Sequence, residues 1–390
     1  MNDGMGEPEA EEKAVLQMGI AKDIGKRLNR IHRPKLNWQL LLAIIFLICF
    51  GILISTFKQQ ISHSGYIGNT IIYMLFGFIT SIVIYLCDYK KMKKYSNIIY
   101  LIATLIMLLP FVGLGLTLNG KNFVRFFGIT FSPCIIAIPL YVITFSGYIY
   151  NYNENKTKTN LLKIIILSTF SLLLVSLLPS LENVLILSII YLVITTAKII
   201  EHNQKIIKKI VLLYGFTLIF LSVLILGLNM TNSINLKHID EQIHSIQKDI
   251  LEHAQFIGEA ESQTFKDGEL LISTESNYTF SYLLGKIGII FSVALTATII
   301  LTSLLLICNI KRINEQYGKY LTIGLSTLFL LESIGNILMN INTNVTIDIN
   351  LPFVTYGSVY FLINCFIISI ILSIYRRKDI NVYDELYNNN

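Results

Sequence analysis

The sequence predicts an all-α, multi-pass membrane protein with about ten transmembrane helices. Of its 390 residues, 53% are hydrophobic and only 14% are charged, and the mean hydropathy is +0.61. A chain of this length could otherwise form two or three soluble domains. Its composition excludes that arrangement, because the apolar residues gather into runs of about 20 that can cross a bilayer as helices.

The expected helices follow the apolar runs in chain order, with boundaries good to about 2–4 residues. They are 38–57, 66–87, 97–118, 132–150, 161–178, 183–200, 210–228, 282–308, 319–340 and 353–375. Together they form a membrane domain over residues 38–378, with a segment 1–37 before it and a tail 379–390 after it.

Lysines and arginines concentrate in every second loop and near both ends of the chain, while the alternate loops carry few. This is the positive-inside pattern of an even number of spans with both termini in the cytoplasm. A nucleic-acid-binding face would be contiguous, whereas these cations fall in six separated segments, so nucleic acid is not expected as a partner. The segments are 22–35, 90–94, 156–163, 205–209, 311–312 and 376–378.

Residues 1–37 start acidic and polar, unlike a cleavable signal peptide. Apolar residues then recur at helical spacing between basic ones, at Leu16, Ile20, Ile24, Leu28 and Ile31. The pattern predicts an amphipathic helix. It would lie either in the plane of the anionic inner leaflet or against cytoplasmic loops.

One large outer segment, residues 229–280, separates the seventh and eighth expected spans. Isoleucines recur in it at helical spacing, with charged residues opposite, at Ile239, Ile243, Ile246, Ile250 and Ile257. We expect an amphipathic helix that lies on the membrane domain.

The five cysteines fall in or at the ends of apolar runs and form no CxxC pair, so they indicate packing residues and not a disulfide framework. The six histidines show no metal-binding spacing. We therefore expect no metal site in the protein itself.

The most specific motif is NILMNINTNVTIDINLPFVTYGS, from Asn336 to Ser358. Its polar centre cannot lie in lipid, where each unpaired backbone group costs several kcal/mol. Pro352 is expected at the first turn of the last span, where proline loses no hydrogen bond. The stretch resembles the C-terminal signature of the SEDS family, which includes FtsW, RodA and SpoVE: N-I-G-M-N-L-G-L-L-P-x-T-G-I-P-L-P-F-V-S-Y-G-G-S.

This sequence keeps eleven residues of the signature, while other residues replace several of the family's glycines and prolines between them. The matching residues are Asn336, Ile337, Met339, Asn340, Ile349, Leu351, Pro352, Phe353, Val354, Tyr356 and Gly357. Shorter likenesses lie upstream. FSPCIIAI resembles F-Q-P-S-E-L-A-K and keeps Pro133, but isoleucines replace the Glu and the Lys. LPSLEN resembles Q-P-D-L-G and keeps Pro179, but Ser180 replaces the Asp.

A further likeness concerns the chemistry. SNYTF at 276–280 resembles the family's T-D-F-x-F at the outer end of the eighth span, with Asn277 at the aspartate position. The resemblance implies that this aspartate is the base that takes a proton from the attacking sugar hydroxyl when a lipid II-like polyprenyl pyrophosphate is polymerised. An amide cannot take it, and losing a positioned base costs about 10²–10⁴-fold in rate. Glu275 is the candidate substitute. The resemblance also requires residue 277 and the Pro352 corner to lie close together.

Candidate substrate-binding residues are the outer cations and the polar motif residues: Lys121, Arg125, Lys286, Asn336 and Tyr356. Lys121 and Arg125 alternate with phenylalanines. They could hold a lipid pyrophosphate or reach the interface beside an aromatic belt. No cofactor is indicated, although an active enzyme could use a divalent cation with the pyrophosphate.

Three functions stay open. The resemblance implies a peptidoglycan glycosyltransferase of the bacterial plasma membrane, with a class B penicillin-binding protein as partner, in division, elongation or sporulation. The altered base position favours a non-catalytic scaffold or regulator of a peptidoglycan-synthesis complex. A lipid or solute transporter would share the coarse topology, but no matched pair of broken spans suggests inverted repeats.

Overall fold

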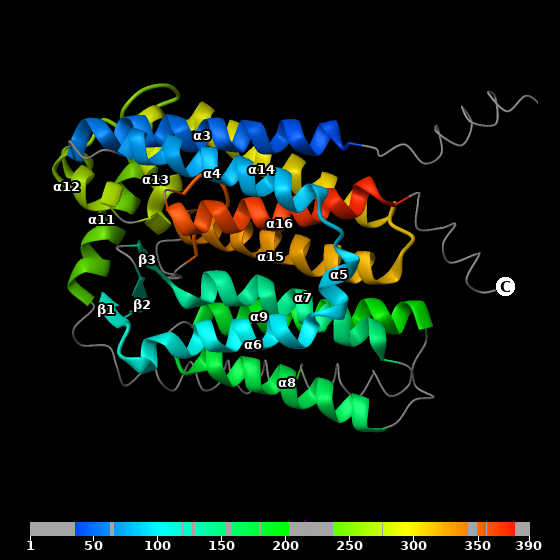
Figure 1. Ribbon diagram of the computed structural model, residues 1–390. Coiled ribbons are helices and arrows are strands. Elements are labelled where there is room, and N and C mark those ends of the chain that lie inside the picture. The colour runs from blue at the N-terminus through cyan, green and yellow to red at the C-terminus, as the bar shows by residue number, and fades with distance from the viewer. Residues whose placement is uncertain are drawn as a thin grey trace, which may run out of the picture.

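The computed structural model describes residues 36–62, 66–118, 121–126, 129–152, 158–178, 181–202, 215, 237–274, 276–341, 349–355 and 357–378. In these ranges, long helices run side by side as a bundle (Figure 1). The bundle helices are α3 (Trp38–Ser62), α4 (Tyr66–Leu86), α6 (Ser96–Leu108), α7 (Pro133–Asn151), α8 (Lys158–Ser176), α9 (Leu181–His202), α14 (Ile289–Ile310), α15 (Gln316–Ile341) and α16 (Ser358–Arg376).

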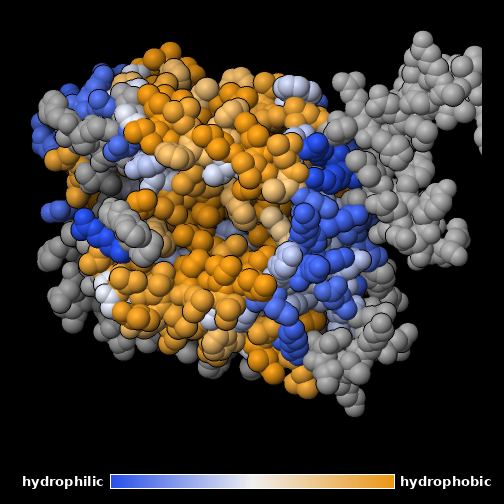
Figure 2. Space-filling model, in the orientation of Figure 1, coloured by the Kyte–Doolittle hydropathy of each residue, from blue (hydrophilic) through white to orange (hydrophobic). Residues whose placement is uncertain are grey.

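The two ends of the bundle carry different elements (Figure 1). One end, which we call the basic end, carries α5 (Lys90–Lys94), the start of α3 and the end of α16. The other, the outer end, carries α11 (Lys237–His253), α12 (Gln263–Thr274), α13 (Thr279–Ile287) and a small sheet. Figure 2 shows a band of hydrophobic residues between them and hydrophilic residues gathered at the basic end. The basic end is the one that the positive-inside rule predicts to face the cytoplasm.

Seven described helices are long and apolar enough to cross a membrane, and two shorter apolar helices accompany them. The seventh predicted run, 210–228, and the predicted helix in residues 1–37 lie almost wholly outside the described residues. Large side chains on α4 and α14 point away from the protein, for example Phe76 at 58% and Val293 at 61% exposure. Such faces are those that lipid would cover.

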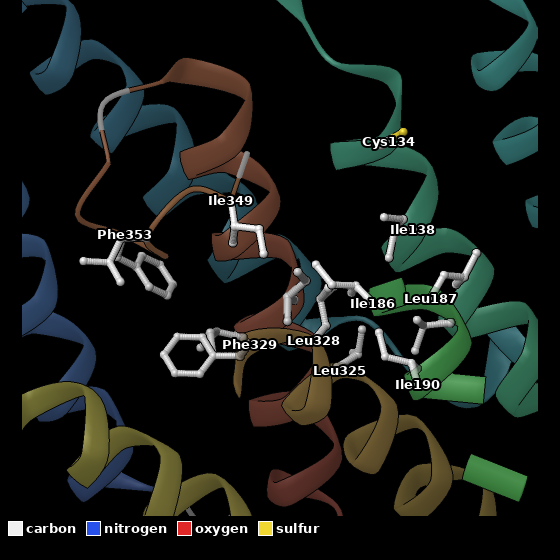
Figure 3. Close-up of a cluster of buried hydrophobic side chains, with 14 of the residues drawn as sticks. Cys134, Ile138, Ile186, Leu187, Ile190, Leu325, Leu328, Phe329, Ile349 and Phe353 are labelled. Atoms are coloured by element: carbon white, nitrogen blue, oxygen red, sulfur yellow. The ribbon is translucent and has the colours of Figure 1, made fainter. Parts of the chain in front are cut away.

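Buried apolar side chains from separate helices meet at the centre of the bundle (Figure 3). Leu325 and Leu328 of α15 lie with Ile190 of α9, and Ile138 of α7 is part of the same cluster. Lipid is as apolar as these side chains, so close packing, and not removal from water, is what favours this association.

The third apolar run is a helix only in its first part. α6 ends at Leu108, and a 3-10 turn, η1 (Leu109–Val112), carries Pro110. Gly113 then has a φ of 86°. The predicted span to residue 118 was therefore wrong at its end, because proline removes a helical hydrogen bond and this glycine turns the chain.

A three-stranded antiparallel sheet follows, in place of the end of the predicted span 97–118 and of the loop expected after it. It consists of β1 (Gly115–Leu118), β2 (Lys121–Phe126) and β3 (Ile129–Phe131). Leu118 lies opposite Lys121 in the register. The Asn119-Gly120 dipeptide between those two residues is the strongest short-range hairpin signal a sequence offers, so the sheet could have been predicted.

The eighth predicted span is divided at Gly288 into α13 and α14. Gly288 has a φ of 104°, and a Cβ there would come within 2.7 Å of the Gln255 carbonyl oxygen. The chain before α12 pairs with this break, since the Ile289 amide donates to Gln255 O at 2.9 Å and the Gly258 amide to Ile287 O at 2.8 Å. The break therefore joins the outer segment to the membrane helix.

The expectation that Pro352 opens the last span was wrong. α16 begins at Ser358, and Pro352 lies in a buried turn before it. The amides of Val354 and Thr355 both donate to Leu351 O, at 3.3 and 3.0 Å, and the Thr355 hydroxyl accepts from the Leu351 amide at 2.8 Å. This closed turn satisfies its own backbone groups, so the chain does not need a helix there.

Candidate functional site

The C-terminal motif and residue 277 meet at the outer end. Asn336 and Asn340 lie one turn apart on α15, exposed by 0% and 1%. Asn277 lies in a 3-10 turn, η2 (Ser276–Tyr278), between α12 and α13 and is exposed by 6%. Its carbonyl oxygen accepts from Asn336 Nδ2 at 2.8 Å and from Asn340 Nδ2 at 3.0 Å. Residue 277 therefore lies against the start of the C-terminal motif, whereas its closeness to the Pro352 corner, which the resemblance requires, stays a prediction.

Both asparagine amides are fully used. Asn336 Nδ2 also donates to the carbonyl oxygen of Ile349 at 2.6 Å, and Asn340 Nδ2 also donates to Asn336 O at 2.8 Å. A side-chain amide has two N–H donors, so neither group has one left for a ligand. These two residues act as a clamp that holds residue 277 and the motif loop against α15.

Buried hydrogen bonds continue from the clamp into the outer segment. Asn340 Oδ1 accepts from the Ser281 amide at 3.0 Å and from the Ser281 hydroxyl at 2.7 Å. Gln247 of α11 donates to the Ser281 hydroxyl oxygen at 3.3 Å, and His244 contacts Gln247 Oε1 at 3.1 Å. The amphipathic helix predicted from its isoleucines is α11, and it does pack on the membrane domain.

That helix is shorter than predicted. The buried isoleucines of the pattern, Ile243, Ile246 and Ile250, face the protein, exposed by 2%, 4% and 0%. α11 ends at His253, and Ile257 lies beyond it and is 66% exposed. Ile257 therefore does not belong to the apolar stripe.

The Asn277 side chain offers no base. Its Oδ1 accepts from the Ser276 hydroxyl at 3.2 Å, and an amide does not take up a proton at neutral pH. Glu275, the candidate substitute, lies outside the described residues, as do Tyr356 and Pro179.

Lys286 of α13 is bound to two carboxylates that the sequence analysis missed. Its Nζ lies 2.9 Å from Glu259 Oε1 and 2.8 Å from Glu269 Oε1. Burial by itself lowers the pKa of Lys286, but hydrogen bonds to Glu269 and Glu259 outweigh that effect and raise this pKa. Lys286 therefore stays charged, and its charge is compensated within the protein.

The other two predicted outer cations, Lys121 and Arg125, lie elsewhere at the outer end. Arg125 is on β2, opposite Thr130 of β3, and is exposed. Lys121 begins the same strand, and its side chain is outside the described part. β2 packs on its neighbouring strands and on η1, so these residues belong to a different region from the 277 clamp.

The predicted structural residues surround the turn before α16. Leu351, Pro352 and Phe353 are buried, and Phe353 has a φ of 64°, which a bulky residue rarely adopts. Gly51 of α3 lies so close that a Cβ would be 2.6 Å from Phe353 O. Packing of α3 on the turn thus holds an unfavourable backbone conformation. Gly357 precedes α16, and Pro133 is buried at the first turn of α7.

Asn340, Ser281, Glu259 and Glu269 were not predicted as site residues. Asn336 and Asn340 are four apart on a helix, which is the spacing of neighbours on one face, so that pair could have been found. Among described residues, no group of three or more His, Cys, Asp and Glu could hold a metal ion. The divalent cation considered with a pyrophosphate substrate stays a prediction.

The bundle and its buried polar clamp define a helical multi-pass membrane protein. The chain belongs to the FtsW/RodA/SpoVE family of cell cycle proteins, whose family model matches residues 34–380. It is thus a multi-pass protein of the plasma membrane. Comparison with curated proteins finds no match.

Solved structures share the fold. A chain from a peptidoglycan synthase complex that coordinates polymerization and crosslinking is 14% identical, with a TM-score of 0.68, covering 88% of this chain and 98% of that one. The rod shape determining protein RodA of Thermus thermophilus is 13% identical, with a TM-score of 0.60, covering 88% and 97%. An aspartate-to-alanine variant of that RodA is also 13% identical, with a TM-score of 0.62, covering 88% and 98%.

Proposed function

We propose that this chain serves peptidoglycan synthesis as a membrane subunit that holds a partner protein and does not itself polymerise lipid II. Family membership supports the pathway. The observation that carries the finer proposal is the state of position 277, where a buried amide stands and its carbonyl is clamped by Asn336 and Asn340.

Polymerisation needs a base for the attacking hydroxyl and positive charge or a metal for the leaving pyrophosphate. Asn277 supplies no base. Lys286, the cation nearest to it in the sequence among the predicted binding residues, is already bound to Glu259 and Glu269. Hydrogen bonds from Asn336 and Asn340 position residue 277, while Asn277 and Lys286 themselves meet neither of these two chemical requirements.

A class B penicillin-binding protein is the partner that the family resemblance implies. The chain from the peptidoglycan synthase complex aligns over most of this chain, which supports a similar assembly here. α11 and α12 lie at the outer end, where an extracellular partner could reach them (Figure 1).

A lipid II polymerisation assay tests the proposal, with purified wild type and the Asn277→Asp variant reconstituted with the candidate transpeptidase. We expect no glycan product from the wild type and retained capture of the transpeptidase. Product from the wild type would overturn the non-catalytic role, and loss of capture would overturn the partner-holding role. Asn277→Asp tests whether restoring the carboxylate restores turnover.

The second candidate is an active glycosyltransferase with a relocated base. Glu275 lies two residues from Asn277 in the sequence, which favours it over more distant carboxylates. In that case the wild type would polymerise lipid II and Glu275→Ala would lower the rate by about 10²–10⁴-fold. Glu261→Ala, at an exposed position in the same outer segment, is the matched control and should change little.

A further inference from the structure

A polar cavity of about 260 Å³ is lined by residues of α5, α6, α7 and α8. α5 and the adjoining ends of these helices lie at the basic end, away from the 277 clamp (Figure 1). The polar lining of the cavity consists of Lys93 and Lys94 from α5, Ser96 and Asn97 from α6, Tyr148 and Asn151 from α7, and Lys163 from α8, together with Tyr152. One water needs about 10–15 Å³ of such space, so the cavity has room for a group much larger than a water molecule.

Hydrogen bonds within the protein hold two of these helices and a lysine in place. Asn97 Oδ1 accepts from the Tyr148 hydroxyl at 2.9 Å and from Lys163 Nζ at 3.1 Å. The Lys163 ammonium also lies 5.3 Å from the centre of the Tyr148 ring. Lys163 therefore has a defined position at the cavity wall and still has donors for a ligand, since an ammonium group has three.

Lys93 is positioned by aromatic rings. Its Nζ lies 4.0 Å from the centre of the Tyr150 ring and 5.9 Å from that of Tyr317. Cation–π contacts of this kind hold an ammonium group without neutralising its charge. Within the described part of the chain, no ion pair with a carboxylate joins Lys93, Lys94 or Lys163.

We propose that this cavity binds a phosphate group at the cytoplasmic face of the membrane. Three lysines line it together with hydroxyl and amide side chains, and phosphate oxygens accept hydrogen bonds from all of these donors. Basic pockets between membrane helices on the cytoplasmic side are known to bind lipid headgroups. The phosphate could belong to an anionic lipid of the inner leaflet or to a soluble compound, because both present the same oxygens.

Ordinary positive-inside anchoring would also place lysines at this end. Anchoring lysines extend separately toward the interface, whereas these three line one cavity and two of them are fixed by named contacts. If the lysines only anchor the protein, removing two charges outside the cavity should weaken lipid binding as much as removing two inside it. If the cavity is a binding site, only the loss inside it should matter.

Binding is measured on the full chain in detergent, by native mass spectrometry, with phosphatidic acid, phosphatidylcholine and inorganic phosphate as probes. The test variant is Lys93→Gln with Lys163→Gln. The control is Lys91→Gln with Lys311→Gln, two exposed lysines of the basic end that do not line the cavity. We expect phosphatidic acid to bind better than phosphatidylcholine, and the test pair to weaken that binding roughly tenfold while the control pair has little effect.

Competition by inorganic phosphate distinguishes the sources. If it displaces phosphatidic acid, the cavity accepts any phosphate; if it does not, the cavity is specific for the lipid. Equal binding of the two lipids, or an equal loss in both double variants, would overturn the proposal. Asn151→Glu covers the case in which the test pair does not fold. This substitution places a carboxylate at the cavity and leaves the hydrogen bonds of Asn97 with Tyr148 and Lys163 in place. It should weaken phosphatidic acid binding by a similar factor.

Discussion

The lysines at the two ends of the bundle have different kinds of partner. At the outer end, Lys286 lies within 2.9 Å of one carboxylate and 2.8 Å of another. At the basic end, Lys93 and Lys163 contact aromatic rings and an amide oxygen, and no described carboxylate pairs with them. Compensated charge stabilises the protein's own structure, whereas uncompensated charge in a cavity can bind an anion. At the outer end Lys286 therefore serves a structural junction, whereas at the basic end Lys93 and Lys163 line the cavity that we propose binds phosphate.

The largest effect should come from breaking the asparagine clamp. Asn336→Leu keeps the branched shape of the side chain but leaves the Ile349 carbonyl without the donor on Asn336, and the Asn277 carbonyl with only the bond from Asn340. A buried unsatisfied group costs about 1–3 kcal/mol and a lost hydrogen bond about 0.5–1.5 kcal/mol, so the free energy of unfolding should fall by about 2–4 kcal/mol. Denaturant unfolding in detergent measures it. Leu338→Ala, on an exposed face of the same helix, is the control, and a loss as large there would contradict the clamp.

A smaller loss should follow a change at the break between α13 and α14. Gly288→Ala adds a Cβ that meets the Gln255 carbonyl, at a φ of 104° that alanine avoids. We expect a cost of about 1–3 kcal/mol, mostly as weaker docking of the outer segment. Hydrogen exchange of residues 237–274 reports this docking. Gly68→Ala, where an added Cβ meets nothing within 4 Å, should leave exchange unchanged.

The Lys286 junction should also show in the pH dependence of stability. The folded-state pKa of Lys286 is raised above its ordinary value of 10.5. Its contribution is therefore complete below pH 10.5 and is lost as the pH rises through the folded-state pKa. Unfolding temperatures from about pH 9 to pH 12 should fall more steeply in the wild type than in Lys286→Gln. An identical alkaline slope in both proteins would show that the ion pairs contribute nothing; Lys266→Gln, exposed on α12, should retain the wild-type slope.

The smallest effect is expected where charges pair in water. Lys248 Nζ lies 3.9 Å from Glu252 Oε1, with side chains 72% and 59% exposed. Exposed pairs contribute about 0–1 kcal/mol. Lys248→Ala should thus change the free energy of unfolding by less than about 0.5 kcal/mol. If Lys248→Ala lowered the free energy of unfolding as much as Asn336→Leu, exposed ion pairs and buried hydrogen bonds would contribute equally, which would contradict this prediction.

Hydropathy located most helices because a bilayer-spanning helix needs a long apolar run, whatever its neighbours are. α7, α9 and α15 begin and end within a few residues of the expected boundaries. The errors fall where a local signal was given too little weight: Pro110 and Gly113 end α6, Asn119-Gly120 joins two strands, and Gly288 breaks the eighth span. These features lie at the ends of the bundle, where the length of an apolar run does not show where the chain turns or a helix ends.

Site residues within a sequence motif could be predicted, whereas their partners from distant segments could not. Residue 277 and Asn336 were both found from motif likeness, but the hydrogen bond between them was not predicted. Lys286 was predicted to bind substrate, but its two carboxylate partners lie 27 and 17 residues earlier in the chain, at Glu259 and Glu269. No spacing rule links those positions, because the connection depends on how α12 and the chain before it dock on α13.

The amino-acid sequence by itself determined the membrane class, the positions of most helices and the absence of a carboxylate at residue 277. These are properties of single residues or of short periodic runs. Only the tertiary structure decided that two asparagines clamp a carbonyl 59 and 63 positions away, that Lys286 is compensated, and that three lysines from two helices line one cavity. Hydrogen bonds and charge pairs act over a few ångströms, so they depend on which helices pack together and at what rotation.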